Sequence, residues 1–347
     1  MDRRRDIIAI GGSLGAVGAM NNLLRSLPPD LAATLFVVIH VGAHGNKLLA
    51  DVLGVNPCFP VTTAVDGERA HPGRAYVAPA DHHLLVIDDI IRLGRGPREN
   101  LSRPAIDPLF RSVAANFGPR TIAIVLTGML NDGAAGLADV KRCGGVTVVQ
   151  NPSDAIAPDM PLGALNANRV DYRASLVDLP GLIHSLTSEE AGPPVPVPPD
   201  IKLEIDIALG REINAHMLST IADPVVISCP SCGGVLSQIK SSPPLRFRCQ
   251  VGHAYTSEAL AAEKEGAVDE AMRVALRIIE ERVALSEKMA EDARRSGFDA
   301  AAAANRRRAA EARRHSETLR RAVLGKAENT ADQSEDLDET AAPPSTS

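Results

Sequence analysis

A serine, a histidine and an aspartate occupy corresponding places in three separate parts of this sequence. Ser13 lies in a G-x-S-x-G pattern that follows an apolar run over 7–10, His40 closes a second apolar run, and Asp132 follows a third. Ligands of an open parallel sheet bind beyond the carboxyl ends of its strands. We therefore expect the three side chains to meet at one edge, where His40 would take the proton of Ser13 and Asp132 would fix the imidazole tautomer.

Each of these features also has a plainer interpretation. A lone G-x-S-x-G pattern occurs by chance, and a glycine-rich turn after a strand also binds dinucleotides. The dinucleotide pattern G-x-G-x-x-G is not satisfied, because Ser13 stands where the second glycine belongs. His40 alone could be a polar cap, and Asp132 alone could belong to a turn or a helix N-cap. It is the joint placement of the three residues that favours catalysis.

The elements that must position these residues alternate between apolar strands and helical segments over 6–187. The expected elements are helices over 16–27, 108–116 and 134–142, a strand over 146–149, and a hairpin over 84–87 and 90–93. This alternation predicts an α/β fold with a doubly wound, mainly parallel, Rossmann-like sheet and an antiparallel addition. The chain order Ser-His-Asp differs from the Ser-Asp-His order of α/β-hydrolases, so that fold is not implied.

Residues 6–187 resemble the catalytic domain of the CheB family of chemotaxis protein-glutamate methylesterases. The motifs that carry the resemblance span the segment: the Gly-Ser turn at 11–15, His40, Asp66-Gly67-Glu68, the stretch 72–79, the stretch 103–107, Thr127-Gly128-Met129, the stretch 131–134, the stretch 144–147 and Met160-Pro161. The resemblance implies a serine esterase that removes methyl groups from glutamate side chains of chemoreceptors. It also implies that receptor glutamines could be deamidated.

The same resemblance assigns roles to individual residues. It makes Ser13 the nucleophile, His40 the base, Asp132 the orienting acid and the backbone amide of Met129 an oxyanion donor. Leu14 stands where the family usually has a hydroxyl residue. Its backbone N–H is still a candidate oxyanion donor, because that role needs no particular side chain.

Two features bear on substrate binding and on control. Arg103 lies four residues before Asp107, and it could bind a substrate carboxylate or form a structural ion pair with Asp107. Members of the family typically begin with a phosphorylatable receiver domain, whereas five residues precede the first expected strand here. We therefore expect control without an attached receiver.

A second set of residues has the spacing of a metal site. Cys229 and Cys232 form a C-x2-C pair, and after sixteen residues Cys249 and His253 form a C-x3-H pair. Two turns that each supply two such ligands suit tetrahedral Zn²⁺, and four protein ligands make a closed, structural site. The alternative is a redox pair at Cys229 and Cys232, for which no thioredoxin-like context is present. We expect structural zinc and no cofactor for catalysis.

Composition narrows the class of protein. The chain has 347 residues, 45% of them hydrophobic, and a formal net charge of -6. That charge, with only 3% aromatic residues and no tryptophan, argues against nucleic-acid binding. No apolar stretch reaches the roughly 20 residues of a membrane span. Together with the cysteine pattern, these features predict a cytoplasmic protein that does not insert into a membrane.

The chain divides by composition into five segments. They are a catalytic domain over 1–188, a proline-rich linker over 189–200, a zinc-binding module over 201–257, an αα-hairpin over 258–325 and a disordered acidic tail over 326–347. The stretch 201–209 has spacing that suits either a strand or a helix. The hairpin could serve self-association, docking on a helical receptor, or simple packing on the zinc module. Cys58 and Cys143 are expected to be ordinary buried or loop thiols.

Three functions follow from these patterns. The first is hydrolysis of glutamate methyl esters on the cytoplasmic domains of methylated chemoreceptors. The second is deamidation of receptor glutamines by the same triad. The third, from a different class, is a regulatory or scaffold protein of a chemosensory pathway with weak or no hydrolysis. Ser13→Ala separates the first two from the third.

Overall fold

A seven-stranded sheet forms the centre of the computed structural model, which describes residues 4–41, 48–54, 59–241 and 243–339. The strand order is β3-β4-β2-β1-β7-β8-β9, and every neighbouring pair is parallel. The strands are β1 (Ile7–Gly12), β2 (Thr34–Ile39), β3 (Val61–Thr63), β4 (Arg74–Val77), β7 (Thr121–Val125), β8 (Val146–Gln150) and β9 (Tyr172–Ala174). The predicted doubly wound α/β sheet is confirmed.

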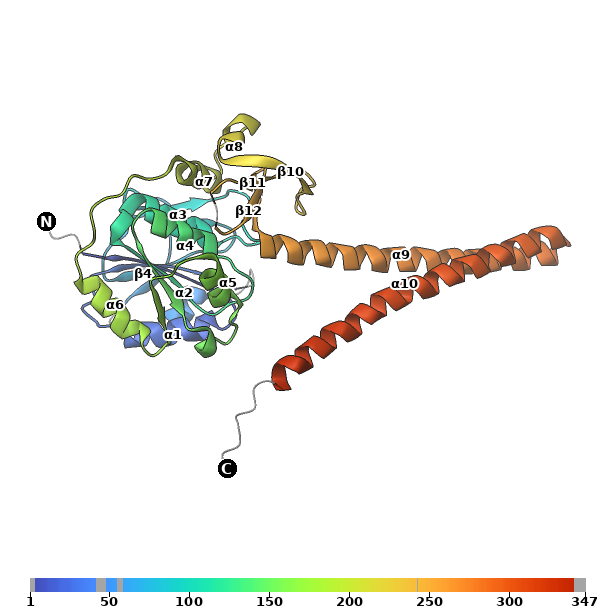
Figure 1. The fold of residues 1–347 in the computed structure, drawn as a ribbon, viewed down its shortest axis with the longest axis horizontal. Helices are drawn as coiled ribbons and strands as arrows, with labels where there is room; N and C mark the ends of the chain where they lie inside the picture. The colour runs from blue at the N-terminus through green and yellow to red at the C-terminus, as the bar shows by residue number, and fades with distance from the viewer. Residues whose placement is uncertain (1–3, 42–47, 55–58, 242, 340–347) are drawn as a thin grey trace, which may run out of the picture. The chain divides into compact units, whose positions relative to one another are not determined.

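Helices cover both faces of this sheet, as Figure 1 shows. One face carries α1 (Ala16–Ser26), α2 (Leu49–Leu53) and α6 (Leu179–Ser188), and the other carries α3 (Ile106–Phe117), α4 (Ala134–Arg142) and α5 (Asp159–Ala167). Along β1, Ile8 and Ile10 pack towards the first face, whereas Ile7 and Ala9 pack towards the second. A strand buried on both faces reads as an unbroken apolar run, which is why the sequence pattern was clear.

The remaining predicted elements of this domain are present with small shifts. The hairpin consists of β5 (His83–Ile87) and β6 (Ile90–Gly94), which pair antiparallel. Helix α3 begins two residues before the expected Pro108. Proline is tolerated in the first turn of a helix because the N–H groups there have no intrahelical partner. Short 3₁₀ turns over Gly118–Arg120 and Pro152–Asp154 form part of the connections.

The ambiguous stretch 201–209 is helical. It forms α7 (Pro199–Leu209), which buries Ile201, Ile205 and Ala208 in the same core as α3. The spacing of these three residues places them on one helical face. Helix α7 also lies close to the strand hairpin, since a Cβ on Gly94 of β6 would meet the carbonyl oxygen of Ala208 at 2.2 Å. This helix therefore packs as part of the catalytic domain, although the sequence analysis grouped it with the zinc module.

A small antiparallel sheet follows α7. Its strands are β10 (Ala222–Ser228), β11 (Val235–Ile239), β12 (Arg246–Cys249) and β13 (Ala254–Thr256), and α8 (Ala215–Ile221) precedes them. We call residues 215–256 the metal-binding module, because all four predicted ligands lie in it. Its main core is small, with Leu236, Phe247 and Tyr255 among its few buried apolar residues, and Leu260 of the following helix packs against them. Residues 1–261, which include the module and the central sheet, form one compact unit.

A buried cluster of charges joins this module to the catalytic domain. Arg248 of β12 forms ion pairs with Glu99 at 2.9 Å and with Glu204 of α7 at 2.8 Å. Arg111 of α3 pairs with the same two carboxylates, at 3.3 Å and 3.0 Å. Asp139 and Arg246 complete the cluster. Removal of one partner from a buried ion pair strongly destabilises a protein, because the other charge is left buried and unpaired. These ion pairs therefore hold the module in place on the catalytic domain.

The second compact unit, residues 262–347, contains most of α9 (Ser257–Arg295) and all of α10 (Asp299–Glu339). Glu287 pairs with Arg313 and Glu280 with Arg320, so the two helices run antiparallel, as the predicted hairpin requires. Gly297, with φ +79°, lies in the turn between them. Helix α10 continues to Glu339, which places residues 326–339 of the expected disordered tail in a helix. Residues 340–347 of that tail and Cys58 lie outside the described residues.

Candidate active site

Ser13 and His40 lie side by side because strands β1 and β2 end in register. The last pair in the ladder joins Gly12 to Ile39, and the backbone N–H of His40 donates to the carbonyl oxygen of Gly12 at 3.0 Å. On the other side of β1, the N–H of Ser13 donates to the carbonyl oxygen of Thr127 at 3.0 Å. The loop after β7 is therefore held against the serine by the main chain.

Glycines shape the turn that carries Ser13. Gly15 has φ +81°, a conformation that side chains rarely adopt, and it precedes the first residue of α1. A Cβ on Gly12 would lie 2.5 Å from the Cβ of Ala16, so the strand and helix approach too closely for any other residue. Gly12 occupies a variable position of the G-x-S-x-G pattern, whose own glycines are Gly11 and Gly15. A Cβ on Gly11 would lie 2.3 Å from Cγ2 of Ile106, so both glycines of the pattern have a structural cause.

Asp132 is buried and surrounded by hydrogen-bond donors. His40 Nε2 lies 3.0 Å from Asp132 Oδ2, and the same oxygen accepts the backbone N–H of Ile106 at 2.7 Å. The other oxygen accepts Nδ2 of Asn100 at 2.8 Å and the N–H of Gly133 at 3.0 Å. Burial raises the pKa of Asp132, but the contact with His40 and these donors outweigh it, so the pKa lies below its usual value.

The arrangement sets the roles of the two imidazole nitrogens. Because Nε2 of His40 is the nitrogen that lies beside the Asp132 carboxylate, Nδ1 is the nitrogen left for another partner. Ile106 is the first residue of α3, so the positive end of that helix also stabilises the Asp132 charge. The site can therefore hold a carboxylate, an imidazole and a serine hydroxyl in the order that acyl transfer needs.

The loop over 127–129 supplies backbone groups beside the serine. A Cβ on Gly128 would lie 2.8 Å from the Cβ of Ser13 and 2.1 Å from Sδ of Met160, so this glycine is in close contact with both. The N–H of Gly128 is already used, because it donates to Ala157. Within the described residues, no partner is found for the N–H groups of Leu14 and Met129.

A second buried carboxyl, Asp107, lies beside the first. Nδ2 of Asn100 donates to Asp107 at 2.9 Å as well as to Asp132, so one amide serves both side chains. Burial, together with the neighbouring charge of Asp132, raises the pKa of Asp107 well above its usual value. Of the two carboxyls, Asp107 is therefore the one that takes up a proton first as the pH falls, which favours charge on Asp132.

Arg103 does not pair with Asp107. Its Nε and Nη2 bind Asp81 at 3.0 and 2.6 Å, and Nη1 donates to the carbonyl oxygen of Gly96 at 2.9 Å. One prediction for Arg103 was a structural ion pair with Asp107. The residue does form an ion pair, but its partner is Asp81. Asp107 is instead occupied by Asn100 and by the N–H of Gly136.

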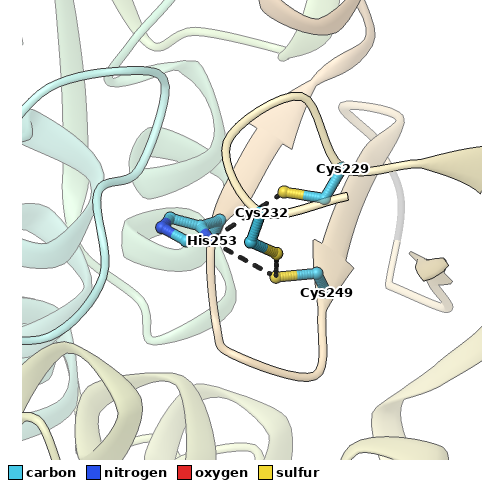
Figure 2. Close-up of side chains that lie close together, drawn as sticks. All are labelled: Cys229, Cys232, Cys249 and His253. Atoms are coloured by element: carbon cyan, nitrogen blue, oxygen red, sulfur yellow. Dashed lines mark hydrogen bonds between the residues drawn. The ribbon is translucent and has the colours of Figure 1, made fainter. Parts of the chain in front are cut away.

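The four predicted metal ligands meet at the end of the small sheet, as Figure 2 shows. Their ligand atoms all lie within 4.8 Å of one another. Sγ of Cys232 is 3.7 Å from Sγ of Cys249, which in turn is 3.5 Å from Nδ1 of His253. Ligands on a tetrahedral zinc ion are separated by about 3.6–3.8 Å, given usual Zn–S and Zn–N distances. The donor set and its spacing therefore fit Zn²⁺.

Asn100 is the site residue that sequence reasoning missed. It has φ +48°, a left-handed conformation that asparagine adopts more readily than most residues. Its position between β6 and α3 carries no recognisable motif. Only the folded chain brings it against Asp132, so no local pattern could have identified it.

Comparison with known proteins places this site in a family. The model of the CheB methylesterase family matches residues 8–183. A protein-glutamate methylesterase/protein-glutamine glutaminase of Pectobacterium atrosepticum is 38% identical over 177 residues, which are 50% of this chain and 49% of that protein. A second such protein, from Methanosarcina mazei, is 33% identical over 176 residues, 48% of each chain. The chain spans about half the length of the curated relatives it matches.

A solved structure agrees with the sequence matches. The crystal structure of the Thermotoga maritima CheB methylesterase catalytic domain superposes with a TM-score of 0.51 and 29% identity. The match covers 54% of this chain and all of that one. Among the described residues, no helix has both the length and the apolarity that crossing a membrane requires.

Proposed function

The chain belongs to the CheB methylesterase family, and from this premise we propose that it hydrolyses methyl esters of glutamate side chains on chemoreceptors. The observation that carries the proposal is the contact of His40 Nε2 with Asp132 Oδ2 at 3.0 Å, beside a serine on the neighbouring strand end. The substrate would be the cytoplasmic domain of a methylated receptor, so the reaction would take place in the cytoplasm.

The proposed reaction passes through an acyl-enzyme. Nδ1 of His40 takes the proton of Ser13 as its Oγ attacks the ester carbonyl carbon. The tetrahedral intermediate collapses, the proton passes from His40 to the departing methoxide, and methanol leaves. Water, deprotonated by the same imidazole, then cleaves the acyl-serine, which returns the proton to Ser13 and frees the glutamate carboxylate. The chain's own residues suffice, and no cofactor takes part in these steps.

The oxyanion of the intermediate needs donors close to Ser13. We assign this role to the backbone N–H groups of Leu14 and Met129, because both lie next to the serine turn and have no partner among the described residues. Donors that point at developing charge in a pocket without water typically contribute a factor of about 10²–10³ to the rate. Arg103, which is committed to Asp81 and Gly96, is kept only as a candidate for binding a substrate carboxylate.

Deamidation of receptor glutamines is the second candidate function. It is favoured by the names of the relatives, which combine protein-glutamate methylesterase with protein-glutamine glutaminase. The same three residues would act, and His40 would protonate the departing amide nitrogen, which leaves as ammonia, rather than the methoxide oxygen, which leaves as methanol. The amide is the harder bond to cleave, because its leaving group must be protonated before it departs.

We also propose that Cys229, Cys232, Cys249 and His253 hold one structural Zn²⁺. Four protein ligands leave no open position for substrate, so the ion would stabilise the fold and take no part in hydrolysis. The small core of the module supports this role, because few apolar residues are available to hold it together without metal. Metal analysis of the purified chain should give one zinc, lost in Cys232→Ser and kept in the matched control Cys143→Ser, whose thiol lies outside the cluster.

Methanol release from methylated receptor cytoplasmic fragments tests the main proposal. We expect Ser13→Ala to lose roughly 10⁴-fold or more in kcat, because the nucleophile is gone. Ser26→Ala, at the exposed end of the same helix α1, should behave like the unchanged chain. Ammonia release from unmodified receptor fragments measures the second candidate in parallel.

The outcomes separate the three functions. Methanol release that depends on Ser13 supports the esterase, and ammonia release without methanol release supports the deamidase. If neither product forms, while the chain still binds a receptor or another partner through its C-terminal helices, it is a scaffold. Self-association through those helices is measured in the same samples by light scattering.

A further inference from the structure

We propose that Asn100 is a positioning residue that couples the metal-binding module to the catalytic acid. The inference rests on the proposed function, since it concerns how Asp132 is held for hydrolysis. Asn100 lies between the two parts of the compact unit and forms hydrogen bonds to both. An intact module would then be required for full activity, although none of its metal ligands touches the reacting atoms.

On the catalytic side, Asn100 uses both amide hydrogens. Nδ2 donates to Asp132 Oδ1 at 2.8 Å and to Asp107 Oδ2 at 2.9 Å. All three side chains are buried. A charge-assisted hydrogen bond in such surroundings stabilises the Asp132 carboxylate and fixes the plane of its two oxygens. That plane sets the direction in which Oδ2 meets His40.

On the module side, strand β13 binds Asn100 at two points. The backbone N–H of Thr256 donates to Oδ1 of Asn100 at 2.9 Å, and the N–H of Asn100 donates to the carbonyl oxygen of Ala254 at 2.8 Å. The side-chain amide is therefore oriented by its surroundings, because only one orientation gives the Thr256 N–H an acceptor and the two carboxyls a donor. Ala254 directly follows the metal ligand His253.

A second connection reaches the residue before Asp132. The hydroxyl of Thr256 donates to Oδ1 of Asn131 at 2.6 Å, and Nδ2 of Asn131 donates to Glu258 at 2.7 Å. Asn131 belongs to the loop that also carries Met129, the assigned oxyanion donor. Strand β13 and the first turn of α9 thus contact both residue 100 and residue 131.

The module holds this strand in place through two features. Cys249 and His253 flank the turn between β12 and β13, so a metal bound to them fixes where β13 begins. In addition, Glu99, the neighbour of Asn100, pairs with Arg248 of β12 at 2.9 Å. Loss of the metal would release the turn, and with it the hydrogen-bond partners of Asn100.

The first test replaces the amide. Asn100→Ala should lower kcat roughly ten- to a hundred-fold, the value of one charge-assisted hydrogen bond. Without the amide the pKa of Asp132 should rise, because one of the donors that hold it down is gone, while Asp107 and Arg111 of α3 stay in place. The acid limb of the kcat/KM profile should therefore move up by about one pH unit. Asn116→Ala is the matched control, because that α3 asparagine also makes three hydrogen bonds, at the far end of the helix.

The second test removes the metal and reads the site without substrate. We compare the zinc-loaded chain, the chelator-treated chain and Cys232→Ser by hydrogen exchange and by labelling of Ser13 with a fluorophosphonate probe. Peptides that cover 98–102 and 128–134 should exchange faster without metal, and labelling should slow by about the factor seen for Asn100→Ala. Loss of metal in Asn100→Ala should then add little, because the connection is already broken.

Two results would overturn the proposal. One is an Asn100→Ala protein with the kcat and acid limb of the Asn116→Ala control. The other is a metal-free chain with unchanged exchange at 98–102 and unchanged labelling of Ser13. Because neither exchange nor labelling needs the receptor, failure of the proposed substrate would show as absent methanol release with both readouts still responding to metal.

Discussion

Gly128 shows how tightly the residues around Ser13 are fitted. It has no side chain to contribute, yet its backbone packs against the serine and against Met160. Its N–H donates to the carbonyl oxygen of Ala157 at 2.9 Å, and its carbonyl oxygen accepts the N–H of Met160 at 2.8 Å. The loop therefore cannot retreat from the serine without breaking main-chain hydrogen bonds.

Gly128→Ala should consequently damage catalysis more than stability. The new Cβ would lie within 3 Å of the Cβ of Ser13, and displacement of the nucleophile by about 1 Å lowers kcat by roughly a hundred-fold. Methanol release and the melting temperature measure the two effects. Gly181→Ala, a helix glycine with open space around it, should keep full activity and gain roughly 0.5–1 kcal/mol. Equal activity of the two variants would contradict this account.

The individual site residues were predictable to different degrees. Ser13, His40 and Asp132 could be proposed because strand ends of a parallel sheet share one edge. The partner of Arg103 could not, since Asp81 is distant in sequence and Asp107 was nearer. Asn100 was out of reach for the same reason, because its role depends on contacts with β13, more than a hundred residues later in the chain.

At the scale of elements, α7 lies at the centre of the buried charge cluster. Its Glu204 receives ion pairs from Arg111 of α3 and from Arg246 and Arg248 of β12. Sequence periodicity could not assign 201–209 to a helix, because isoleucines at every second position also suit a strand. In the folded chain this stretch is a helix, because that conformation places Ile201, Ile205 and Ala208 in the core and Glu204 among the arginines.

Glu204→Gln should destabilise the protein in a manner that depends on pH. Burial raises the pKa of Glu204, but the three arginines outweigh it and hold the pKa below its ordinary value of 4.5. The stabilisation that this charge provides is therefore fully present above pH 4.5 and decreases as the pH falls from there towards the lower pKa of the folded state. In urea unfolding, we expect the free energy of unfolding of Glu204→Gln to be about 3–5 kcal/mol lower than that of the unchanged chain at pH 7. This difference should become smaller towards pH 3. The exposed Glu212→Gln serves as control, and a deficit constant with pH would argue against an ionised Glu204.

At the scale of the whole molecule, residues 1–261 form one compact unit and 262–347 another. The sequence divided the chain into five segments by composition, but it could not show that α7 and the small sheet pack on the catalytic domain. Composition marks linkers well, whereas the buried ion pairs across a boundary leave no compositional trace.

Two truncations test whether the catalytic domain depends on α7 and the small sheet. A chain that ends after Ala261 keeps every partner of Glu99, Asn100 and Arg111 described here, so it should retain zinc, a melting temperature close to that of the full chain, and hydrolysis of a small methyl ester. A chain that ends at 188 loses Glu204, Arg248 and β13, so it should melt at a clearly lower temperature and hydrolyse the ester more slowly. Calorimetry and methanol release compare them, and equal behaviour would mean that the catalytic domain is independent.

The strand order β3-β4-β2-β1-β7-β8-β9 has a consequence for folding during synthesis. Ser13 and His40 are synthesised early, and the strands that carry them, β1 and β2, are neighbours in both the sequence and the sheet. Asp132 arrives only after β7 has been synthesised and has added to the opposite edge of β1. A chain still emerging from the ribosome therefore carries Ser13 and His40 before Asp132 has reached His40. The nascent chain should therefore not hydrolyse esters in the cell until the second half of the sheet has folded onto β1.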